Sequence, residues 1–225
     1  MQAELIMVGT ELLLGEVIDT NSAFLAQRLA ELGVDLYYVT RVGDNRQRIT
    51  RIVQEACQRA DFVITAGGLG PTADDLTKEA VADAFGLELE LCNEVLTVLE
   101  ERLSFIETCM SDNNRRQAYL PKGAQALPNP KGTAPGVLLE LPEGKTVVML
   151  PGVPVELQAI MDDSVVPYIR RRLSEDEIAT IYSRVLRFYG LGESNLDSMV
   201  QDIIPAGTNP TIAPYAAGGE GAMVG

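Results

Sequence analysis

The sequence predicts an α/β protein with a doubly wound, mostly parallel sheet in three layers, followed by a small α+β module. Short β-branched apolar runs alternate with longer segments of helical spacing, as in βαβ units. A glycine-rich turn also follows the apolar run at 62–66, and in such sheets ligands bind outside the carboxyl ends of the strands. A basic cluster at 170–172 meets an acidic one at 175–177, so we place a domain boundary there and expect domains at 1–172 and 173–225.

Each element of the first domain has its own signal. The strands are largely uncharged runs of Val, Ile and Leu, typical of strands buried on both faces. The helices carry apolar residues three and four apart, and cap-forming residues precede them. In chain order we expect a strand at 3–8, a helix between Asn21 and Gly33, a strand at 34–40, a helix after Asp44, a strand at 62–66, helices at 77–85 and 93–109, a loop segment at 121–135 with a short strand at 124–127, strands at 137–141 and 146–150 around a turn at 142–145, and a helix running from the turn at 151–154 towards Arg172.

The composition excludes several classes of function. A net charge of −14 over 225 residues opposes nonspecific binding to nucleic acids or acidic membranes, although a small phosphorylated ligand remains compatible. Histidine is absent, which excludes a Ser-His-Asp triad and imidazole-ligated zinc. The three cysteines form no Cys-x-x-Cys pair and are expected to be reduced. Without a signal peptide or a membrane-spanning apolar run, we expect a cytoplasmic protein.

The segment 61–75 has the order that an anion site needs. Glycines 67, 68 and 70 permit positive φ and a close backbone approach, so that free amides can face a phosphate. Asp74 and Asp75 would repel that phosphate unless a divalent cation lies between them, and oxygen ligands favour magnesium or manganese. The structural alternative is a tight turn in which Asp75 or Thr72 caps the next helix. Asp44 has the same alternative as a helix cap.

The residues at 67–80, GGLGPTADDLTKEA, resemble the signature of the molybdopterin-binding-like domain in the competence-damage-inducible CinA family. The resemblance covers essentially the whole chain. One departure is Val153, where the family commonly has a second proline, and it affects only the stiffness of that loop. Six further stretches resemble family segments in the same order: 9–15, 19–21, 42–45, 113–118, 129–136 and 150–152.

The second domain resembles the small KH-like module of the same family. We expect a strand at 180–189, a helix at 193–204 and a short strand at 210–214. After Leu173 there are two basic and seven acidic residues, so RNA binding is not expected, and a spacer or dimerisation role fits better. The family continues beyond the position of Gly225, so we expect this module to be incomplete. The family's carboxyl-terminal amidohydrolase domain does not appear in this sequence, and we do not carry its activity over.

The resemblance and the strand-end positions together define the candidate site. Asp44, Asp74 and Asp75 are the expected catalytic and metal-binding residues. In the alternative interpretation, Asp74 is a solvent-exposed carboxylate that only complements the dipole of the next helix. The residues at 113–116 are then only exposed on the surface of a helix. The expected substrate-binding residues are Thr10, Glu11, Gly67, Gly68, Gly70, Thr72, Asn113, Asn114, Arg115, Thr133, Pro151 and Gly152.

The resemblance implies metal-dependent hydrolysis of ADP-ribose to AMP and ribose 5-phosphate, with magnesium, manganese or cobalt. This chemistry suits a site without histidine, because a cation can neutralise diphosphate oxygens and activate water. Two alternatives remain open at this level: molybdopterin binding or adenylyl transfer, and a nucleotide-sensing or scaffold module without turnover. We expect a small phosphorylated nucleotide as ligand, no nucleic-acid or membrane partner, and a homodimer.

Overall fold

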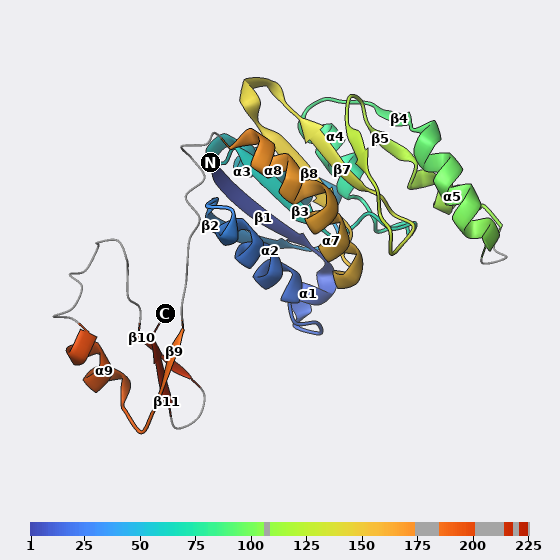
Figure 1. Cartoon of the computed structure of the whole chain (residues 1–225). Helices are drawn as coiled ribbons and strands as arrows, with labels where there is room; N and C mark the ends of the chain where they lie inside the picture. Colours follow the sequence, from blue (N-terminus) through green and yellow to red (C-terminus); the bar gives the residue numbers. More distant parts are fainter. Residues whose placement is uncertain (106–108, 174–184, 201–213, 218–220, 225) are drawn as a thin grey trace. The chain divides into compact units, whose positions relative to one another are not determined.

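Two compact units, residues 1–180 and 181–225, make up the chain in the computed structural model. The structure describes all residues except 106–108, 174–184, 201–213, 218–220 and 225 (Figure 1). The expected boundary between 172 and 173 stays a prediction, because the residues that follow it lie outside the described ranges.

A six-stranded sheet, mostly parallel at its centre, organises the first unit. The strand order is β2-β1-β3-β8-β7-β6, and the four strands from β2 to β8 run parallel. β7 pairs antiparallel with both β8 and β6. This architecture confirms the predicted fold class. The strands are β1 (Gln2–Val8), β2 (Asp35–Val42), β3 (Phe62–Ala66), β6 (Gln125–Leu127), β7 (Gly136–Glu140) and β8 (Thr146–Leu150).

Helices cover both faces of this sheet (Figure 1). On one face, α2 (Thr20–Glu31), α7 (Pro154–Ile160) and α8 (Val166–Arg172) pack in one hydrophobic cluster with Leu5 and Met7 of β1. The opposite cluster contains Ile6 and Val8 together with α3 (Arg46–Arg59), α4 (Thr77–Ala84) and α5 (Asn93–Phe105). Successive side chains of a strand point to opposite faces, so an apolar strand supplies both cores.

Several short elements differ from the sequence prediction. α1 (Thr10–Leu14) and α6 (Asp112–Arg116) are helices of five residues, and β4 (Leu89–Leu91) pairs antiparallel with β5 (Tyr119–Pro121). None of them is long enough to show a hydrophobic period. The helix expected at 93–109 is described up to Phe105, and 106–108 lie outside the described residues.

Two predicted connections show informative local geometry. The turn between β7 and β8 is a short 3-10 segment (Pro142–Gly144) in which Glu143 and Gly144 have φ of 62° and 73°. The helix expected up to Arg172 is present, but between α7 and α8 it forms a π-helical turn (Met161–Val165), where the Val166 N–H donates to the Met161 carbonyl. Pro167 follows directly and has no N–H of its own, and proline commonly disturbs helical register.

The second unit contains an antiparallel sheet in the order β10-β11-β9, formed by β9 (Leu186–Tyr189), β10 (Pro214–Ala217) and β11 (Gly221–Val224), with α9 (Glu193–Val200). The strand expected at 180–189 and the helix expected at 193–204 are described only in these parts. Almost all of the strand expected at 210–214 lies outside the described residues. No described helix combines the length and the hydropathy needed to cross a membrane. All three cysteines are free thiols.

Candidate functional site

A cavity of about 440 Å³ lies where the carboxyl ends of β1, β3 and β8 meet. The chain leaves β1 towards β2 on one side and later returns to β3 on the other, so the β1–β3 border is the switch point of the sheet. Doubly wound sheets bind ligands at this position. The residues that follow the three strands, Gly9, Gly67 and Pro151, all line the cavity.

The loop after β3 is held against its neighbours by its first two glycines. Gly67 has φ of 107°, and a Cβ at this residue would lie 2.1 Å from the Val8 carbonyl oxygen, so only glycine fits. Its N–H donates to the Leu150 carbonyl at 2.9 Å. The hydroxyl of Thr77, the first residue of α4, donates to the Gly67 carbonyl at 2.8 Å, and its N–H donates to the Gly68 carbonyl at 3.1 Å. The loop is therefore fixed to β1, β8 and α4.

The next part of this loop offers backbone donors. Gly68, Leu69 and Gly70 line the cavity, and within the described residues their N–H groups have no hydrogen-bond acceptor. Leu69 is buried and Gly68 and Gly70 are partly buried, so three adjacent donors without a partner among the described residues leave a place for a ligand or for water. Consecutive main-chain donors of this kind suit an anion.

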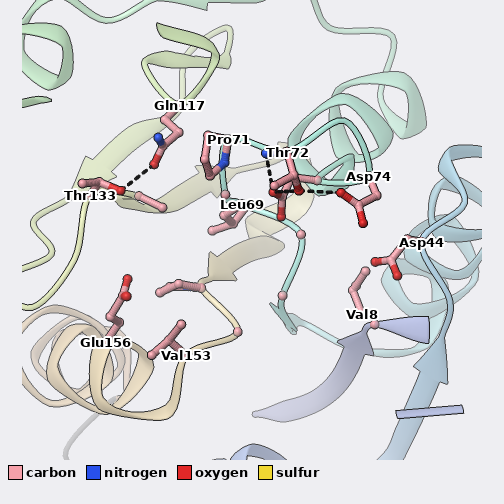
Figure 2. Close-up of a pocket in the computed structure, with 18 of the residues that line it drawn as sticks. Val8, Asp44, Leu69, Pro71, Thr72, Asp74, Gln117, Thr133, Val153 and Glu156 are labelled. Carbon is pink, nitrogen blue, oxygen red and sulfur yellow. Dashed lines mark hydrogen bonds between the residues drawn. The ribbon is translucent and has the colours of Figure 1, made fainter. Parts of the chain in front are cut away.

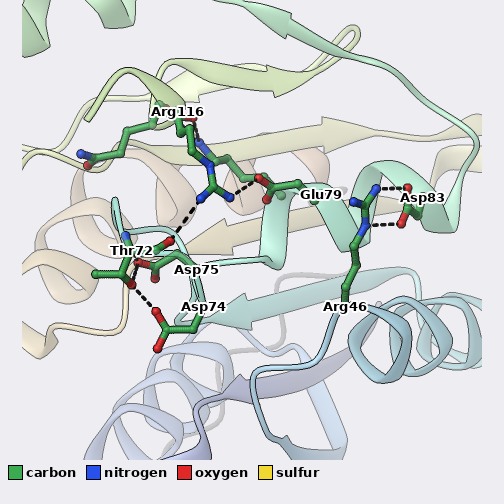
Figure 3. Close-up of polar contacts among 9 residues, drawn as sticks. Arg46, Thr72, Asp74, Asp75, Glu79, Asp83 and Arg116 are labelled. Carbon is green, nitrogen blue, oxygen red and sulfur yellow. Dashed lines mark hydrogen bonds and ion pairs between the residues drawn. The ribbon is translucent and has the colours of Figure 1, made fainter. Parts of the chain in front are cut away.

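Thr72 organises the two aspartates that follow (Figure 3). The Thr72 N–H donates to Asp75 Oδ2 at 2.8 Å, and the Thr72 hydroxyl lies within hydrogen-bond distance of Asp74 Oδ1 and, at 2.5 Å, of Asp75 Oδ2. The Thr72 hydrogen bond lowers the pKa of Asp74, with a second contribution from the Asp74 backbone. α4 begins only at Thr77, and its cap residue, Leu76, makes no side-chain capping bond. The alternative of Asp75 or Thr72 as a helix cap is therefore wrong, since Asp75 closes a turn before the helix.

Asp44 connects the ends of β1 and β2. The Thr10 N–H donates to Asp44 Oδ2 at 2.8 Å, and the Asp44 N–H donates to Thr10 Oγ1 at 3.2 Å. The cap of α3 is Asn45, whose side chain accepts from the Arg48 N–H, so the helix-cap alternative for Asp44 is also wrong. The carboxylate of Glu11 lies over Gly9, where a Cβ would be 2.4 Å from Glu11 Oε1.

The structure brings together most, but not all, of the residues predicted from the sequence. Thr10 does not line the cavity and contacts it only through Asp44. Asn113, Asn114 and Arg115 lie on α6 and are also absent from the cavity lining. The predicted residues that do line it are Glu11, Asp44, Gly67, Gly68, Gly70, Thr72, Asp74, Asp75, Thr133, Pro151 and Gly152.

Gln117 and Glu156 also line the cavity and were not among the predicted site residues. Figure 2 shows them with Thr133 on one side of the cavity, and Asp44 and Asp74 on the other. Glu156 lies in the first turn of α7, after the carboxyl end of β8. Its position follows from the parallel pairing of β8 with β3. The signal available in the sequence was its place just after the turn at 151–154, which follows a predicted strand. Gln117 comes from the segment between α6 and β5, and its signal in the sequence was its place in the stretch 113–118, which resembles a family segment.

Two cations lie behind the glycine loop, outside the cavity lining. Arg116 donates to Glu79 Oε1 at 3.0 Å and to the Thr72 carbonyl at 3.4 Å (Figure 3). Lys78 is buried, and its Nζ donates to the carbonyls of Arg116 and Gln117 at 2.8 and 3.0 Å. Burial lowers the pKa of Lys78 to about 8. These contacts connect α4 to the segment that carries Gln117.

The cavity lining is acidic. It contains five carboxylates and no lysine or arginine among the described residues: Glu11, Asp44, Asp74, Asp75 and Glu156. In the same part of the chain, no three Asp, Glu, Cys or His side chains converge closely enough to form a metal-binding group by themselves. An anionic ligand in this cavity therefore needs the backbone donors and a compensating cation.

Fold and site together define a molybdopterin-binding-like α/β domain. Residues 4–171 match the family model described as "Probable molybdopterin binding domain", and residues 183–222 match the "Damage-inducible protein CinA KH domain". The chain is 31% identical to the crystal structure of the protein CinA from Thermoplasma acidophilum, with a TM-score of 0.71 over 75% of this chain and 99% of that one. The chain belongs to the CinA family, as the sequence resemblance predicted.

More distant structures and longer relatives complete the comparison. The molybdopterin biosynthesis enzyme MoaB from Thermus thermophilus shares the fold, with 18% identity and a TM-score of 0.51 over 76% of this chain and 92% of that one. Competence-damage inducible proteins of Caldicellulosiruptor bescii and Clostridioides difficile are 48% and 49% identical over 96% of this chain. The chain spans about half the length of these curated relatives, 51% and 50%.

Proposed function

We propose that this chain hydrolyses the diphosphate of a nucleoside diphosphate sugar in a metal-dependent reaction, with ADP-ribose giving AMP and ribose 5-phosphate. One observation carries the proposal: the N–H groups of Gly68, Leu69 and Gly70, which have no acceptor among the described residues, line the same cavity as Asp44, Asp74 and Asp75. Donors for a phosphoryl group and carboxylates for a cation are thus combined at the switch point. The cavity volume is also in the range of small-ligand sites.

The glycine loop would bind one phosphoryl group and stabilise the charge that develops on it. Its donors are already positioned, because Gly67 and Gly68 are fixed to β8 and α4. Preorganised donors of this kind are commonly worth about 3 kcal/mol each in transition-state stabilisation. A carboxylate among Asp44, Asp74 and Asp75 would orient the attacking water, and the lowered pKa of Asp74 keeps that group ionised at neutral pH.

The donor set fits a divalent cation that binds together with the phosphates. Mg²⁺ usually retains several waters and binds through one or two carboxylates plus substrate phosphate oxygens, so a group of three protein ligands is not required. Asp44 Oδ1 and Asp75 Oδ1 accept no hydrogen bond from the described residues and remain available. When bound, such a cation neutralises phosphate charge and lowers the pKa of a coordinated water.

The test is incubation of the purified chain with ADP-ribose and Mg²⁺, Mn²⁺ or Co²⁺, with AMP measured by chromatography. Asp74→Asn should lower the rate at least tenfold, because it removes a negative charge from the proposed cation site. Asp163→Asn is the matched control, since Asp163 is exposed on the π-helical turn and does not line the cavity. Absence of AMP from the unmodified chain with every metal would remove the pyrophosphatase proposal.

A second candidate is binding or adenylylation of molybdopterin, which the matched family description favours. Both reactions handle an adenylate diphosphate, so the same glycine loop would serve. Pyrophosphate release from ATP that depends on added molybdopterin would select this candidate. A third candidate, nucleotide sensing without turnover, is favoured by the lack of a three-carboxylate metal group in the described residues. Calorimetric binding of ADP-ribose with no AMP formed would select it.

We also propose that the chain acts as a homodimer in the cytoplasm on a small nucleotide, without nucleic-acid or membrane partners. The net charge of −14 supports the exclusion of polyanionic partners. In the second unit, β9 and β10 are the outer strands of a three-stranded sheet, and edge strands favour pairing with another copy.

A further inference from the structure

The wall of the cavity opposite Asp44 and Asp74 has no role in the proposed phosphate chemistry. It is formed by Gln117, Thr133 and Glu156, which Figure 2 shows on the side away from these two aspartates. A carboxylate repels a phosphoryl group and does not help to bind one directly. Glu156 and its neighbours therefore call for a different part of the ligand.

Glu156 is held in one position by the loop that it contacts. Asn129 is 6% exposed and donates through Nδ2 to Glu156 Oε2 at 2.7 Å and to the Ala134 carbonyl at 2.7 Å. Asn129 Oδ1 accepts from the N–H groups of Lys131 and Gly132, both at 2.9 Å. With these four bonds the amide is fully used. Glu156 Oε2 is thus fixed, while Oε1 accepts no hydrogen bond from the described residues.

Gly132 brings the loop even closer to this carboxylate. A Cβ at Gly132 would lie 2.1 Å from Glu156 Oε2, so the contact depends on the absence of a side chain. Glu156 itself is half-buried in the first turn of α7. The loop from Asn129 to Ala134 and the start of α7 therefore present one oriented acceptor to the cavity.

A donor lies on the same wall. Gln117 is 1% exposed, and its Oε1 accepts from the Thr133 hydroxyl at 3.0 Å. Its Nε2 has no acceptor among the described residues, although the residue lines the cavity. This nitrogen is not fully enclosed, so it is free to donate into the cavity, to a ligand acceptor or to water. Because Thr133 uses its proton on Gln117, its oxygen is left as a further acceptor.

An oriented carboxylate and an amide donor on the same wall match the hydroxyls of a sugar, which both donate and accept. A phosphate, which only accepts at neutral pH, would be repelled by Glu156. We propose that Glu156, with Gln117 and Thr133, is the subsite for the hydroxyls of the distal ribose, the sugar on the far side of the diphosphate from adenosine. The inference rests on the proposed function and identifies the part of its substrate that this wall selects.

The experiment is isothermal titration calorimetry on the full chain with Mg²⁺ present. Four ligands are compared: ADP-ribose, ADP, ribose 5-phosphate and 2-deoxyribose 5-phosphate. Glu156→Gln keeps the shape and an oxygen for Asn129, but replaces the free acceptor with a donor. Glu101→Gln is the matched control, because Glu101 is exposed on α5 and does not line the cavity.

We expect wild type to bind ribose 5-phosphate at least fivefold more tightly than its 2-deoxy analogue. Glu156→Gln should weaken the binding of ADP-ribose and of ribose 5-phosphate about tenfold, as expected for the loss of a hydrogen bond to a charged group. It should also remove the preference for ribose 5-phosphate over its 2-deoxy analogue. The affinity for ADP should change less than twofold in Glu156→Gln, and Glu101→Gln should bind all four ligands with wild-type affinity. The sugar subsite is overturned if wild type does not bind ribose 5-phosphate, if Glu156→Gln binds all ligands normally, or if it weakens ADP equally.

Failure of the hydrolytic proposal gives a different result. If the binding pattern is as expected but wild type releases no AMP from ADP-ribose, the sugar subsite stands and hydrolysis is refuted. If AMP is released but Glu156→Gln binds and turns over ADP-ribose as wild type does, hydrolysis stands and the subsite is refuted.

Discussion

Substitution of Gly67 tests the claim that the glycine loop is built for a close approach between β1 and β3. Gly67 has φ of 107°, and an added Cβ would lie 2.1 Å from the backbone oxygen of Val8. The backbone conformation alone costs an alanine about 1–3 kcal/mol, and displacing a β1 carbonyl adds a similar amount. We therefore expect Gly67→Ala to lower the free energy of unfolding by about 3 kcal/mol or more.

Gly86 provides the matched control for this substitution. It has φ of 64°, and no atom of the described residues lies within 4 Å of the position of its Cβ. Gly86→Ala should thus lower the free energy of unfolding only by the cost of a positive φ for alanine, about 1 kcal/mol. Urea unfolding followed by circular dichroism measures both variants. The melting temperature of the Gly67 variant should be several degrees below that of the wild type, because a chain of this size loses about 2–4 °C per kcal/mol of stability. Equal losses in the two variants would refute the close-approach argument.

Three further predictions concern stability and assembly. Glu4 is fully buried and accepts two hydrogen bonds from Arg59, at 2.7 and 2.8 Å. Arg59→Met leaves this carboxylate without its charged partner and should lower the urea midpoint at least about three times as far as Arg51→Met, which removes an exposed ion pair. Similar losses in the two variants would contradict this prediction. The pKa of Lys78 in the folded chain is about 8, which is below its value in the unfolded chain. Between about pH 8 and 10.5 the folded state therefore binds fewer protons than the unfolded state. The contribution of Lys78 to the free energy of unfolding should rise with pH in this range, by up to about 3 kcal/mol. Lys78→Met should remove this rise of the free energy of unfolding with pH, as measured by urea unfolding at several pH values. A pH dependence equal to that of the wild type would count against the prediction. Sedimentation velocity should show a homodimer at micromolar concentration, whereas a monomer throughout would refute the dimer proposal.

The central elements of the fold were predictable because each is determined by its own residues. β3 and β8 each begin directly after a charged residue and end at a turn that starts with glycine or proline, and both are fully buried. Their neighbours repeat the alternation with helices, which requires a parallel sheet. Elements determined by distant contacts were not predictable. β4 and β5 are three residues each and exist through pairing with one another. The π-helical turn was missed for a different reason, because it is a local shift of one hydrogen bond inside a continuous helix and leaves no hydrophobic pattern of its own.

The site was predictable where it follows from strand ends, and unpredictable where it depends on packing. The glycine loop, Asp44, Asp74 and Asp75 follow β2 and β3, so topology alone brings them to one rim. Asn113 to Arg115 were selected by residue type and motif, but α6 places them away from the cavity. Gln117 lies in the stretch 113–118 that resembles a family segment, but its position at the cavity depends on the contacts of buried Lys78, which connect that segment to α4.

The most direct test of the account is a crystal structure of the chain with ADP-ribose and Mn²⁺, using anomalous scattering to locate the metal. The account predicts phosphoryl oxygens within hydrogen-bond distance of the Gly68, Leu69 and Gly70 N–H groups, with Mn²⁺ between the diphosphate and Asp44, Asp74 or Asp75. A diphosphate bound elsewhere, or Mn²⁺ with no contact to these aspartates, would contradict it.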